Sequence, residues 1–338
     1  MADNVPIPNE EVQHSNLKTS IIKSIGGIAT LPIHVVKTLM QLGWEPFPCE
    51  TGKVYIFFGN SAYFLPNGFM YIYKIAKRDG CRVLFKGLDC FVLFNFTNEY
   101  VRSSVNNYLD IEYPNLGGEL HPRADDFIKL NDKEAFAVSF RNFVRDMVSH
   151  NTAVVVSRPF LVLFVRQIAQ IIGNENKYTN VIRDIYTIGS EEGLKGFFSG
   201  LTAAIVATST TVTLSHLFSF ILERSLLKFQ QNDNETEEEN ITKIKRTRSV
   251  LGNVIPIICN SWSYRYQLVS SIMAVSGSQL ACSLLPYTPQ FNHYEDFIDY
   301  LKPNGSISRG SKLFLRQYKG PISIKNVNEV YANTGYIS

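Results

Sequence analysis

Residues 73–88, YKIAKRDGCRVLFKGL, recur at residues 186–201 as YTIGSEEGLKGFFSGL. The two stretches align without gaps at an offset of 113 residues and share six identical positions. Both contain an acid followed by glycine, then four residues, an aromatic residue, one further residue and a second glycine. Because the chain has 338 residues, about three times this offset, the recurrence predicts three tandem units.

A weaker third copy surrounds Gly305, which lies 112 residues beyond Gly193. Residues 294–301 precede it and place apolar side chains at helical spacing, with acids between them. The apolar set is Tyr294, Phe297, Ile298 and Leu301, and the acids are Glu295, Asp296 and Asp299. This pattern predicts an amphipathic helix, so each unit is expected to carry a short surface helix before its glycine.

The composition excludes several classes of protein. With 45% apolar and 19% charged residues and a mean hydropathy of −0.03, the chain is neither disordered nor collagen-like and fits a soluble protein or a polar-rich membrane protein. A net charge of +3 predicts no nucleic-acid partner. Five scattered cysteines predict no disulfide framework and favour a non-oxidising setting. No basic residue precedes Lys18, so neither a secretory signal nor a cleavable transit peptide is expected.

Five stretches are long enough to cross a membrane as helices. Residues 196–222 contain no Asp, Glu, Lys or Arg and exceed the roughly 20 residues that a spanning helix needs. The other four carry charges and lie at residues 18–43, 86–109, 140–173 and 249–275. A soluble bundle of amphipathic helices is the alternative, but it accounts poorly for residues 196–222.

Each predicted span has one polar stripe. In the first span, polar residues from Lys23 to Gln41 step by three and four positions, which places them on one face. A charge in hydrocarbon costs at least ~2.5 kcal/mol, so the stripes should face one another or water. They predict a bundle around a hydrophilic groove, lined by His34, Lys37, Arg145, His150, Thr208, Thr211, Asn260 and Gln267.

Two helices per unit would make six, yet no sixth span follows the fifth. Residues 317–338 contain no apolar run of spanning length and are predicted to form a polar C-terminal tail. Residues 230–248, an acidic block followed by a basic one, are predicted to form a charged loop whose role is unassigned. The other predicted divisions are a polar tail at 1–17 and one domain at 18–316, with repeats at 18–110, 140–229 and 249–316.

The three units resemble the mitochondrial carrier fold over roughly residues 18–316. The acid-Gly-x4-aromatic-basic-Gly motif of that fold is complete from Asp79 to Gly87, and its second copy, from Glu192 to Gly200, lacks only the basic residue. The resemblance implies an all-α membrane protein: a three-repeat helical bundle with amphipathic surface helices and a sixth transmembrane helix that is missing or truncated. Structural roles are expected for the helix-kinking prolines and the motif residues, namely Pro32, Pro159, Asp79, Gly80, Gly87, Glu192, Gly193 and Gly200.

Carriers that transport solutes also have Pro-x-acid-x-x-base in each odd-numbered helix, and these charges form an ion-pair ring that closes one gate. The corresponding stretches here read PIHVVK at 32–37, PFLVLF at 159–164 and RYQLVS at 265–270. No acid is present, and Lys37 is the one base that remains. Without the ring and the sixth helix, the sequence offers no obvious route to alternating access.

This pattern of loss resembles the mitochondrial carrier homolog proteins of the outer membrane, as do SRPF at 157–160, PYTP at 286–289 and SRGSKLF at 308–314. The resemblance implies a multi-pass insertase that moves tail-anchored and other α-helical proteins into the mitochondrial outer membrane. It also implies that some members dock pro-apoptotic partners. A docking receptor or scaffold for apoptotic regulators and a small-solute carrier stay open as alternatives.

No enzyme activity and no cofactor are expected, because the sequence lacks metal-spaced histidines, a nucleophile elbow and a phosphate-binding glycine loop. Individual groove residues also have plainer interpretations. Lys37 could extend its amine to the membrane surface or pair with Glu99, and His34 and His150 could make ordinary hydrogen bonds between helices.

Overall fold

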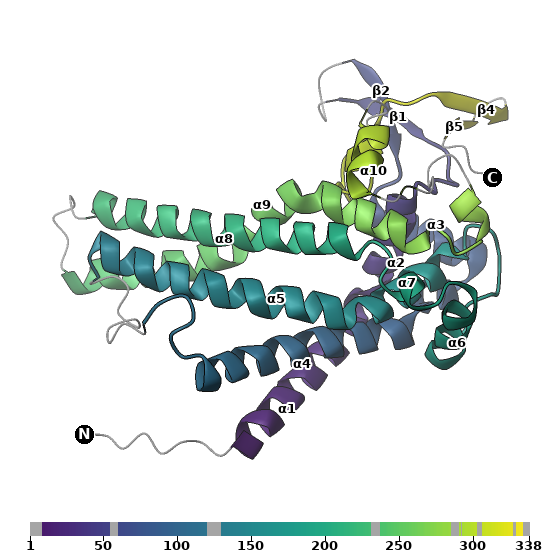
Figure 1. Cartoon of the computed structure of the whole chain (residues 1–338). Coiled ribbons are helices and arrows are strands. Elements are labelled where there is room, and N and C mark those ends of the chain that lie inside the picture. The colour runs from purple at the N-terminus through teal and green to yellow at the C-terminus, as the bar shows by residue number, and fades with distance from the viewer. Residues whose placement is uncertain are drawn as a thin grey trace. The chain divides into compact units, whose positions relative to one another are not determined.

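The protein is described by a computed structural model covering residues 9–54, 60–119, 130–230, 237–284, 291, 293–302, 306–326 and 329–333 (Figure 1). Most of these residues are helical. The α-helices are α1 (Asn9–Gly27), α2 (Leu31–Leu42), α3 (Gly68–Asp79), α4 (Leu88–Glu112), α5 (Asp132–Ala169), α6 (Val181–Glu191), α7 (Leu194–Phe197), α8 (Leu201–Gln230), α9 (Glu237–Val275) and α10 (Tyr294–Leu301). The strands are β1 (Glu50–Lys53), β2 (Ser61–Leu65), β3 (Arg316–Tyr318), β4 (Ile322–Asn326) and β5 (Glu329–Ala332).

Three described segments are long and apolar enough to cross a membrane: Ser15–Leu42, Asp132–Ala169 and Leu194–Lys228. They coincide with three of the five predicted spans, and the protein is an all-α membrane protein. Only 11% of the apolar window in Leu194–Lys228 is buried inside the protein, so most of its apolar surface is left for lipid. The spanning of α4 and α9, which carry more polar residues, remains a prediction.

The three surface helices begin at a constant spacing. Their N-cap residues are Asn67, Asn180 and His293, each 113 residues from the next. The side chains of Asn67 and Asn180 accept hydrogen bonds from the backbone N–H groups of Met70 and Arg183, at 2.8 and 3.0 Å, as asparagine commonly does at a helix start. The structure thus repeats the 113-residue period of the sequence, although Gly305 itself lies outside the described residues.

The predicted helix over residues 294–301 is confirmed as α10. Phe297 and Leu301 are buried, whereas Glu295, Asp296 and Asp299 are exposed. The apolar face therefore packs on the protein and the acids face outward, as the spacing predicts.

The four motif glycines adopt positive φ angles: +87° at Gly80, +80° at Gly87, +66° at Gly193 and +69° at Gly200. Residues other than glycine are strained at these positive φ angles. At Gly193 an added Cβ would meet nothing within 4 Å, whereas at Gly200 it would lie 2.7 Å from the carbonyl oxygen of Ser270. Gly200 is thus required both for its backbone conformation and for the close approach of α9.

We expect Gly200→Ala to lower the free energy of unfolding by about 1–3 kcal/mol more than Gly193→Ala, because overpacking adds to a backbone strain of comparable size at both positions. Denaturant unfolding in detergent micelles measures the difference. Equal losses in the two variants would show that the neighbouring backbone moves away without cost.

The first predicted span is interrupted near its middle. A 3-10 turn, Ile28–Thr30, separates α1 from α2, and Pro32 lies in the first turn of α2. There the missing N–H of proline removes no helical hydrogen bond. Pro159 and Pro256, in contrast, lie inside α5 and α9, which continue through them.

The chain forms two compact units, which are described separately. The bundle unit comprises residues 99–154 and 205–264, with the N-terminal residues up to Asn16. The core unit comprises residues 17–98, 155–204 and 265 onward. The division falls inside α1, α4, α5, α8 and α9, so neither unit coincides with one sequence repeat.

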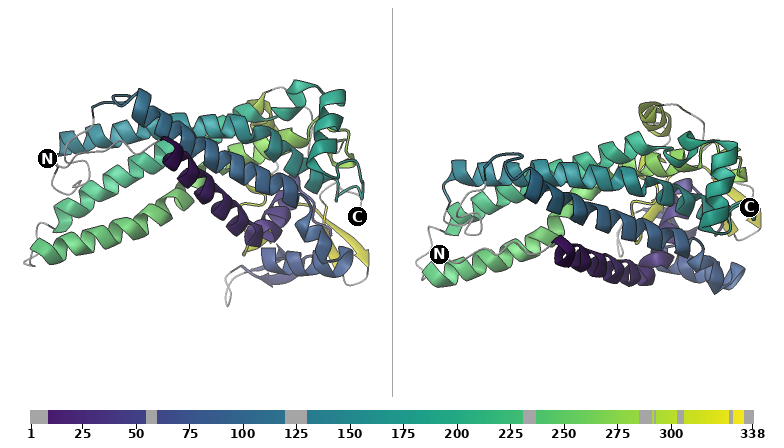
Figure 2. Two further views of the ribbon diagram at one scale, coloured as in Figure 1. Left: turned by 90° about the horizontal axis from the view of Figure 1, so that it is seen from below. Right: turned by 60° about the horizontal axis from the view of Figure 1, so that its bottom comes forward.

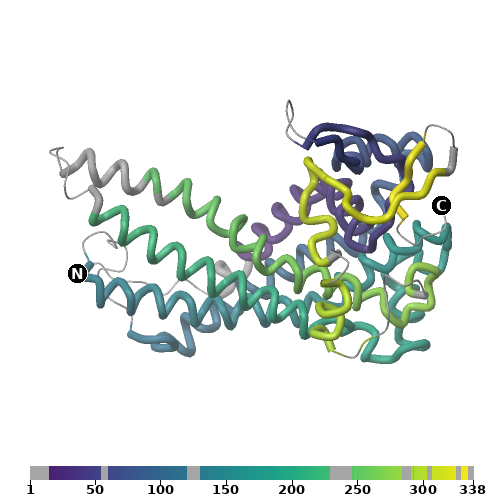
Figure 3. The backbone as a smooth tube through the Cα atoms, turned by 90° about the horizontal axis from the view of Figure 1, so that it is seen from above, coloured from purple at the N-terminus to yellow at the C-terminus, as the bar shows by residue number. Residues whose placement is uncertain are grey.

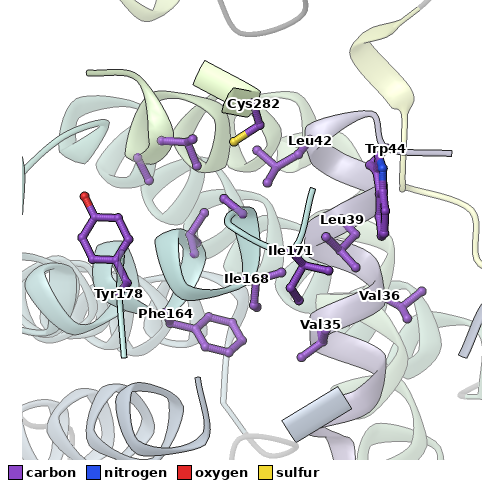
Figure 4. Packing of buried hydrophobic residues seen from close by; sticks show 14 of the residues in the cluster. Val35, Val36, Leu39, Leu42, Trp44, Phe164, Ile168, Ile171, Tyr178 and Cys282 are labelled. Atoms are coloured by element: carbon purple, nitrogen blue, oxygen red, sulfur yellow. The ribbon is translucent and has the colours of Figure 1, made fainter. Parts of the chain in front are cut away.

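The core unit is built around α2 and the C-terminal part of α5. Val35 and Leu39 of α2 and Ile168 of α5 are fully buried, and Figure 4 shows them with Trp44 and Phe164 in one apolar cluster. Because Val35, Leu39 and Ile168 lie in candidate membrane spans, close van der Waals packing rather than transfer from water stabilises the cluster. The apolar faces that the sequence predicts for these helices supply this core.

Two small antiparallel sheets belong to the core unit and were not expected from the sequence. The first has the strand order β1-β2-β3, so the C-terminal β3, yellow in Figure 3, pairs with the dark β2. The second is the β4-β5 pair. The prediction of a polar tail at 317–338 is therefore wrong in part, because the alternation of Ile322 and Ile324 with polar residues suits a strand. Among the described residues after α10 there is no further α-helix.

The predicted charged loop at 230–248 is also wrong in part. Gln230 ends α8, and α9 begins at Glu237. Residues 237–248 are therefore helical, and residues 231–236 lie outside the described residues.

Candidate functional site

Charged side chains join α4 to α5 within the bundle unit. Glu99 pairs with Arg102 one turn later, at 3.3 Å, and Arg102 Nη1 lies 3.3 Å from Nε2 of His150. Because a guanidinium can only donate, His150 Nε2 accepts this hydrogen bond. His150 Nδ1 lies 2.8 Å from the carbonyl oxygen of Asp146 and so acts as the donor. His150 thus links Arg102 of α4 to the backbone of α5.

Further polar contacts join α5 to α8. His216 Nε2 lies 2.9 Å from Oδ2 of Asp146. Two turns earlier along α8, Ser209 accepts a hydrogen bond from the amide of Asn151 at 3.1 Å. These pairs hold α5 and α8 together through polar side chains over about two helical turns.

One more contact extends the series to α9. The hydroxyls of Thr211 and Ser263 are 2.7 Å apart, and α8 and α9 run beside one another in opposite directions (Figure 2). These three groups of contacts are together called the polar interior below, which consists of Glu99, Arg102, Asp146, His150, Asn151, Ser209, Thr211, His216 and Ser263.

The same four helices carry large apolar side chains at exposed positions. Trp262 of α9 is 62% exposed and Ile257 is 71% exposed. Others are Phe136, Phe140, Val148, Leu217, Ile221, Val250, Val254 and Ile258. Large apolar side chains exposed in this number indicate contact with lipid or a partner rather than water. Apolar outer faces and paired polar side chains between helices are the arrangement expected of a bundle in lipid.

The polar interior is not sealed. The side chains of Arg102, Asp146 and His216 keep 33%, 39% and 23% of their surface accessible. Each makes a hydrogen bond within the bundle unit and still has side-chain surface that an incoming group can reach.

Two of the predicted groove residues, His150 and Thr211, belong to the polar interior. Thr208 lies one turn before Thr211 on α8 and is half-buried. Asn260 lies one turn before Ser263 on α9 and is exposed.

Arg145 has a different set of contacts. It is 7% exposed, forms an ion pair with Asp110 and donates to the carbonyl oxygen of Tyr113 at 3.1 Å. Arg141 donates nearby to the carbonyl oxygens of Pro114 and Gly118, at 2.8 and 3.2 Å. Both arginines thus fasten the carbonyl-rich C-terminal end of α4, as cations commonly do at helix ends. The structure gives Arg145 a stabilising position, and its groove role stays a prediction.

The remaining predicted groove residues, His34, Lys37 and Gln267, lie in the core unit. His34 is exposed, whereas Lys37 and Gln267 are half-buried. That they share one groove with the polar interior remains a prediction.

Aromatic rings occupy two of the six positions at which a carrier would place gate charges, and the other four are occupied by Lys37, Leu161, Gln267 and Ser270. The ring of His34 lies 5.1 Å from that of Phe91, which lies 5.2 Å from that of Phe164. His34 stands at the acid position of the first proline motif, and Phe164 at the base position of the second. Phe164 is 3% exposed and packs in the apolar core, so no ion pair can form there.

The motif acids have unequal environments. The carboxylate of Glu192 accepts hydrogen bonds from two guanidinium nitrogens of Arg166, which is fully buried on α5. The third nitrogen of Arg166 donates to the carbonyl oxygen of Ala274 at 2.8 Å. Asp79 pairs with the adjacent Arg78 at an exposed position. The second motif is therefore linked through Arg166 to both α5 and α9, whereas the ion pair of Asp79 in the first motif links no distant segment.

Within the described ranges, no group of three or more His, Cys, Asp or Glu side chains is placed to hold a metal ion. The polar residues that the predicted groove set omits are chiefly Arg102, Asp146 and His216. A signal for two of them was available, because Asp146 lies four residues before His150 and Arg102 belongs to the polar stripe of its span. Their partners on other helices could not be inferred from spacing.

Comparison with known proteins gives a consistent set of relatives. The chain is 28% identical over 290 residues to Mitochondrial carrier homolog 2 of Homo sapiens, a match that covers 86% of this chain and 90% of that protein. It is 28% identical over 291 residues to the protein of the same name from Mus musculus. Mitochondrial carrier homolog 1 of Mus musculus is 26% identical over 297 residues, which cover 85% of this chain and 72% of that protein. No family model matches the chain.

Proposed function

Because the chain belongs to the mitochondrial carrier homolog family, we propose that it is an insertase that places tail-anchored and other α-helical proteins into the outer mitochondrial membrane. The protein itself is a mitochondrial membrane protein with transmembrane helices. We place it in the outer membrane as a multi-pass protein, with the polar interior of the bundle unit as the path for polar parts of the client.

The observation that carries the proposal is that the bundle unit has polar side chains between its helices and exposed apolar side chains on the same helices. On α5, Asp146 and His150 make polar contacts with α8 and α4, whereas Val148 between them is exposed. A helix that faces polar groups on one side and lipid on the other can lower the free-energy barrier to membrane insertion of a client segment that has both polar and apolar residues. No covalent step is needed.

The physical task is to carry the polar flank of a client helix across hydrocarbon. Each charged residue at the bilayer centre costs about 2.5–3.5 kcal/mol on the scale measured for helix insertion. Partly accessible carboxylate, guanidinium and imidazole groups offer substitute hydrogen bonds along the way, while the apolar part of the client stays in lipid. The client then leaves sideways as a finished transmembrane helix.

The aromatic series from His34 to Phe164 weighs against the solute-carrier alternative. A carrier opens and closes by making and breaking ion pairs, but none of the equivalent positions here carries an acid, and the ring of Phe164 at one of them packs in the apolar core. Reopening such a cluster exposes apolar surface to water, which costs several kcal/mol.

Reconstitution of the purified protein into liposomes tests the function. A tail-anchored client should become protease-protected several-fold faster than in empty liposomes. Insertion no faster than in empty liposomes contradicts the proposal, and stable client binding without insertion favours a docking receptor. Uptake of small solutes above empty vesicles favours the carrier alternative.

His150→Leu should slow client insertion about tenfold, equivalent to about 1.4 kcal/mol of barrier, because it removes one polar partner from the path. Val148→Leu is the matched control, since it changes an exposed apolar residue on the same helix and should leave the rate unchanged. Both rates are measured at equal amounts of reconstituted protein. The same rate in both variants would place the path elsewhere.

A further inference from the structure

Helix α3 is fastened where the first candidate span ends. The hydroxyl of Tyr71 donates to the carbonyl oxygen of Trp44 at 2.6 Å, and the rings of Tyr71 and Phe47 meet edge to face at 5.2 Å. Tyr71 and Ile75 are fully buried. Because the span Ser15–Leu42 ends two residues before Trp44, α3 lies at the level where the chain leaves the hydrocarbon.

The opposite face of α3 is apolar and uncovered. Phe69 and Tyr73, one turn apart, are each 61% exposed. The ring of Phe69 lies 5.8 Å from that of Phe314, which is 68% exposed. The backbone N–H of Gly68 donates to the carbonyl oxygen of Leu313 at 2.6 Å and holds this distant segment on α3. The resulting aromatic patch consists of Phe69, Met70, Tyr73, Phe314 and Leu315, all exposed.

Basic side chains flank the aromatic patch. Lys77 is exposed one turn beyond Tyr73, and Lys312 is exposed two residues before Phe314. The nearby acids Glu50 and Asp79 are each paired with a base, at 3.4 Å to Lys74 and 2.6 Å to Arg78. The unneutralised charge beside the patch is therefore positive.

We propose that the aromatic patch docks on the lipid bilayer, with its rings at headgroup depth and Lys77 and Lys312 against anionic lipid phosphates. Aromatic residues concentrate at this depth because their rings are amphipathic, and lysines next to it interact with anionic headgroups. The rings face the headgroup region of the bilayer, where the neighbouring span also ends. The docking holds α3 and the segment around Phe314 at the membrane surface and does not depend on client insertion.

Photo-crosslinking to lipid tests the docking. The full chain is reconstituted with a photoreactive residue in place of Phe314 or, as control, in place of the exposed Gln317 on β3. Position 314 should crosslink to phospholipid several-fold more than position 317. In vesicles of phosphatidylcholine with added phosphatidylinositol, Lys77→Gln with Lys312→Gln should lower that yield, and in phosphatidylcholine alone it should not.

Equal lipid yields from positions 314 and 317 would overturn the proposal, as would capture of a second protein chain instead of lipid at position 314. A charge effect of the same size in both vesicle types would exclude the role of anionic headgroups. Insertion of a client is scored separately, so loss of docking and loss of the proposed function are distinguishable.

Discussion

Arg166→Met should lower the free energy of unfolding by about 3–5 kcal/mol, as expected when one partner of a buried ion pair is removed. Arg166 is fully buried, and its guanidinium binds the Glu192 carboxylate through two nitrogens and the carbonyl oxygen of Ala274 through a third. Methionine fills a similar volume but leaves the carboxylate and the carbonyl without this donor. Unfolding in detergent micelles, followed by denaturant titration, measures the loss.

Two further variants separate charge from geometry at this site. Arg166→Lys keeps the charge but cannot bind both carboxylate oxygens and the carbonyl at once, so an intermediate loss is expected. The double variant Arg166→Met with Glu192→Met leaves no unpaired charge. Its loss in free energy of unfolding should therefore be smaller than the sum of the losses in the two single variants. Strictly additive losses would mean that the two side chains do not stabilise one another.

Arg316→Met is expected to cost a similar amount, about 3–5 kcal/mol at neutral pH, with a dependence on pH that identifies the cause. Arg316 of β3 is buried, pairs with the buried Glu45 and donates to the carbonyl oxygen of Pro66 at 2.9 Å. Burial raises the pKa of the Glu45 carboxyl, and the Arg316 charge opposes this rise. Loss of Arg316 therefore raises the pKa of Glu45 further.

A carboxyl with a raised pKa in the folded state binds a proton there more readily than in the unfolded chain, so stability increases as the pH falls through the folded-state pKa. The deficit of Arg316→Met relative to the unchanged protein should shrink as the pH falls from neutral toward the ordinary pKa of a glutamate carboxyl. Adding Glu45→Gln should remove this dependence. A deficit that stays constant over the range would show that Glu45 is not the group left unpaired.

The repeat could be predicted because it rests on local features. The motif glycines mark positive φ angles, and the asparagines at 67 and 180 mark helix starts, each of which depends only on neighbouring residues. The strands could not be predicted in this way. β3 is held by the ion pair between Arg316 and Glu45 and by its pairing with β2. Both are contacts between segments far apart in the chain.

The candidate site shows the same limit. Helical spacing identified His150 and Thr211 as inward-facing, and both lie in the polar interior. Spacing also selected Arg145, whose groove role stays a prediction. That its guanidinium fastens the end of α4 could not be predicted, because the direction of a long side chain depends on the carbonyl groups within its reach. Asp146 and His216 were omitted, since their importance lies in their contact across two helices.

The central claim is that the polar interior of the bundle unit receives the polar flank of a client during insertion. A photoreactive residue in place of Thr211 tests it most directly, with the exposed Leu217 on the same helix as control position. In liposomes, a client caught during insertion should crosslink to position 211 and much less to position 217. Insertion that proceeds with no crosslink at position 211, or with equal crosslinks at both positions, would contradict it.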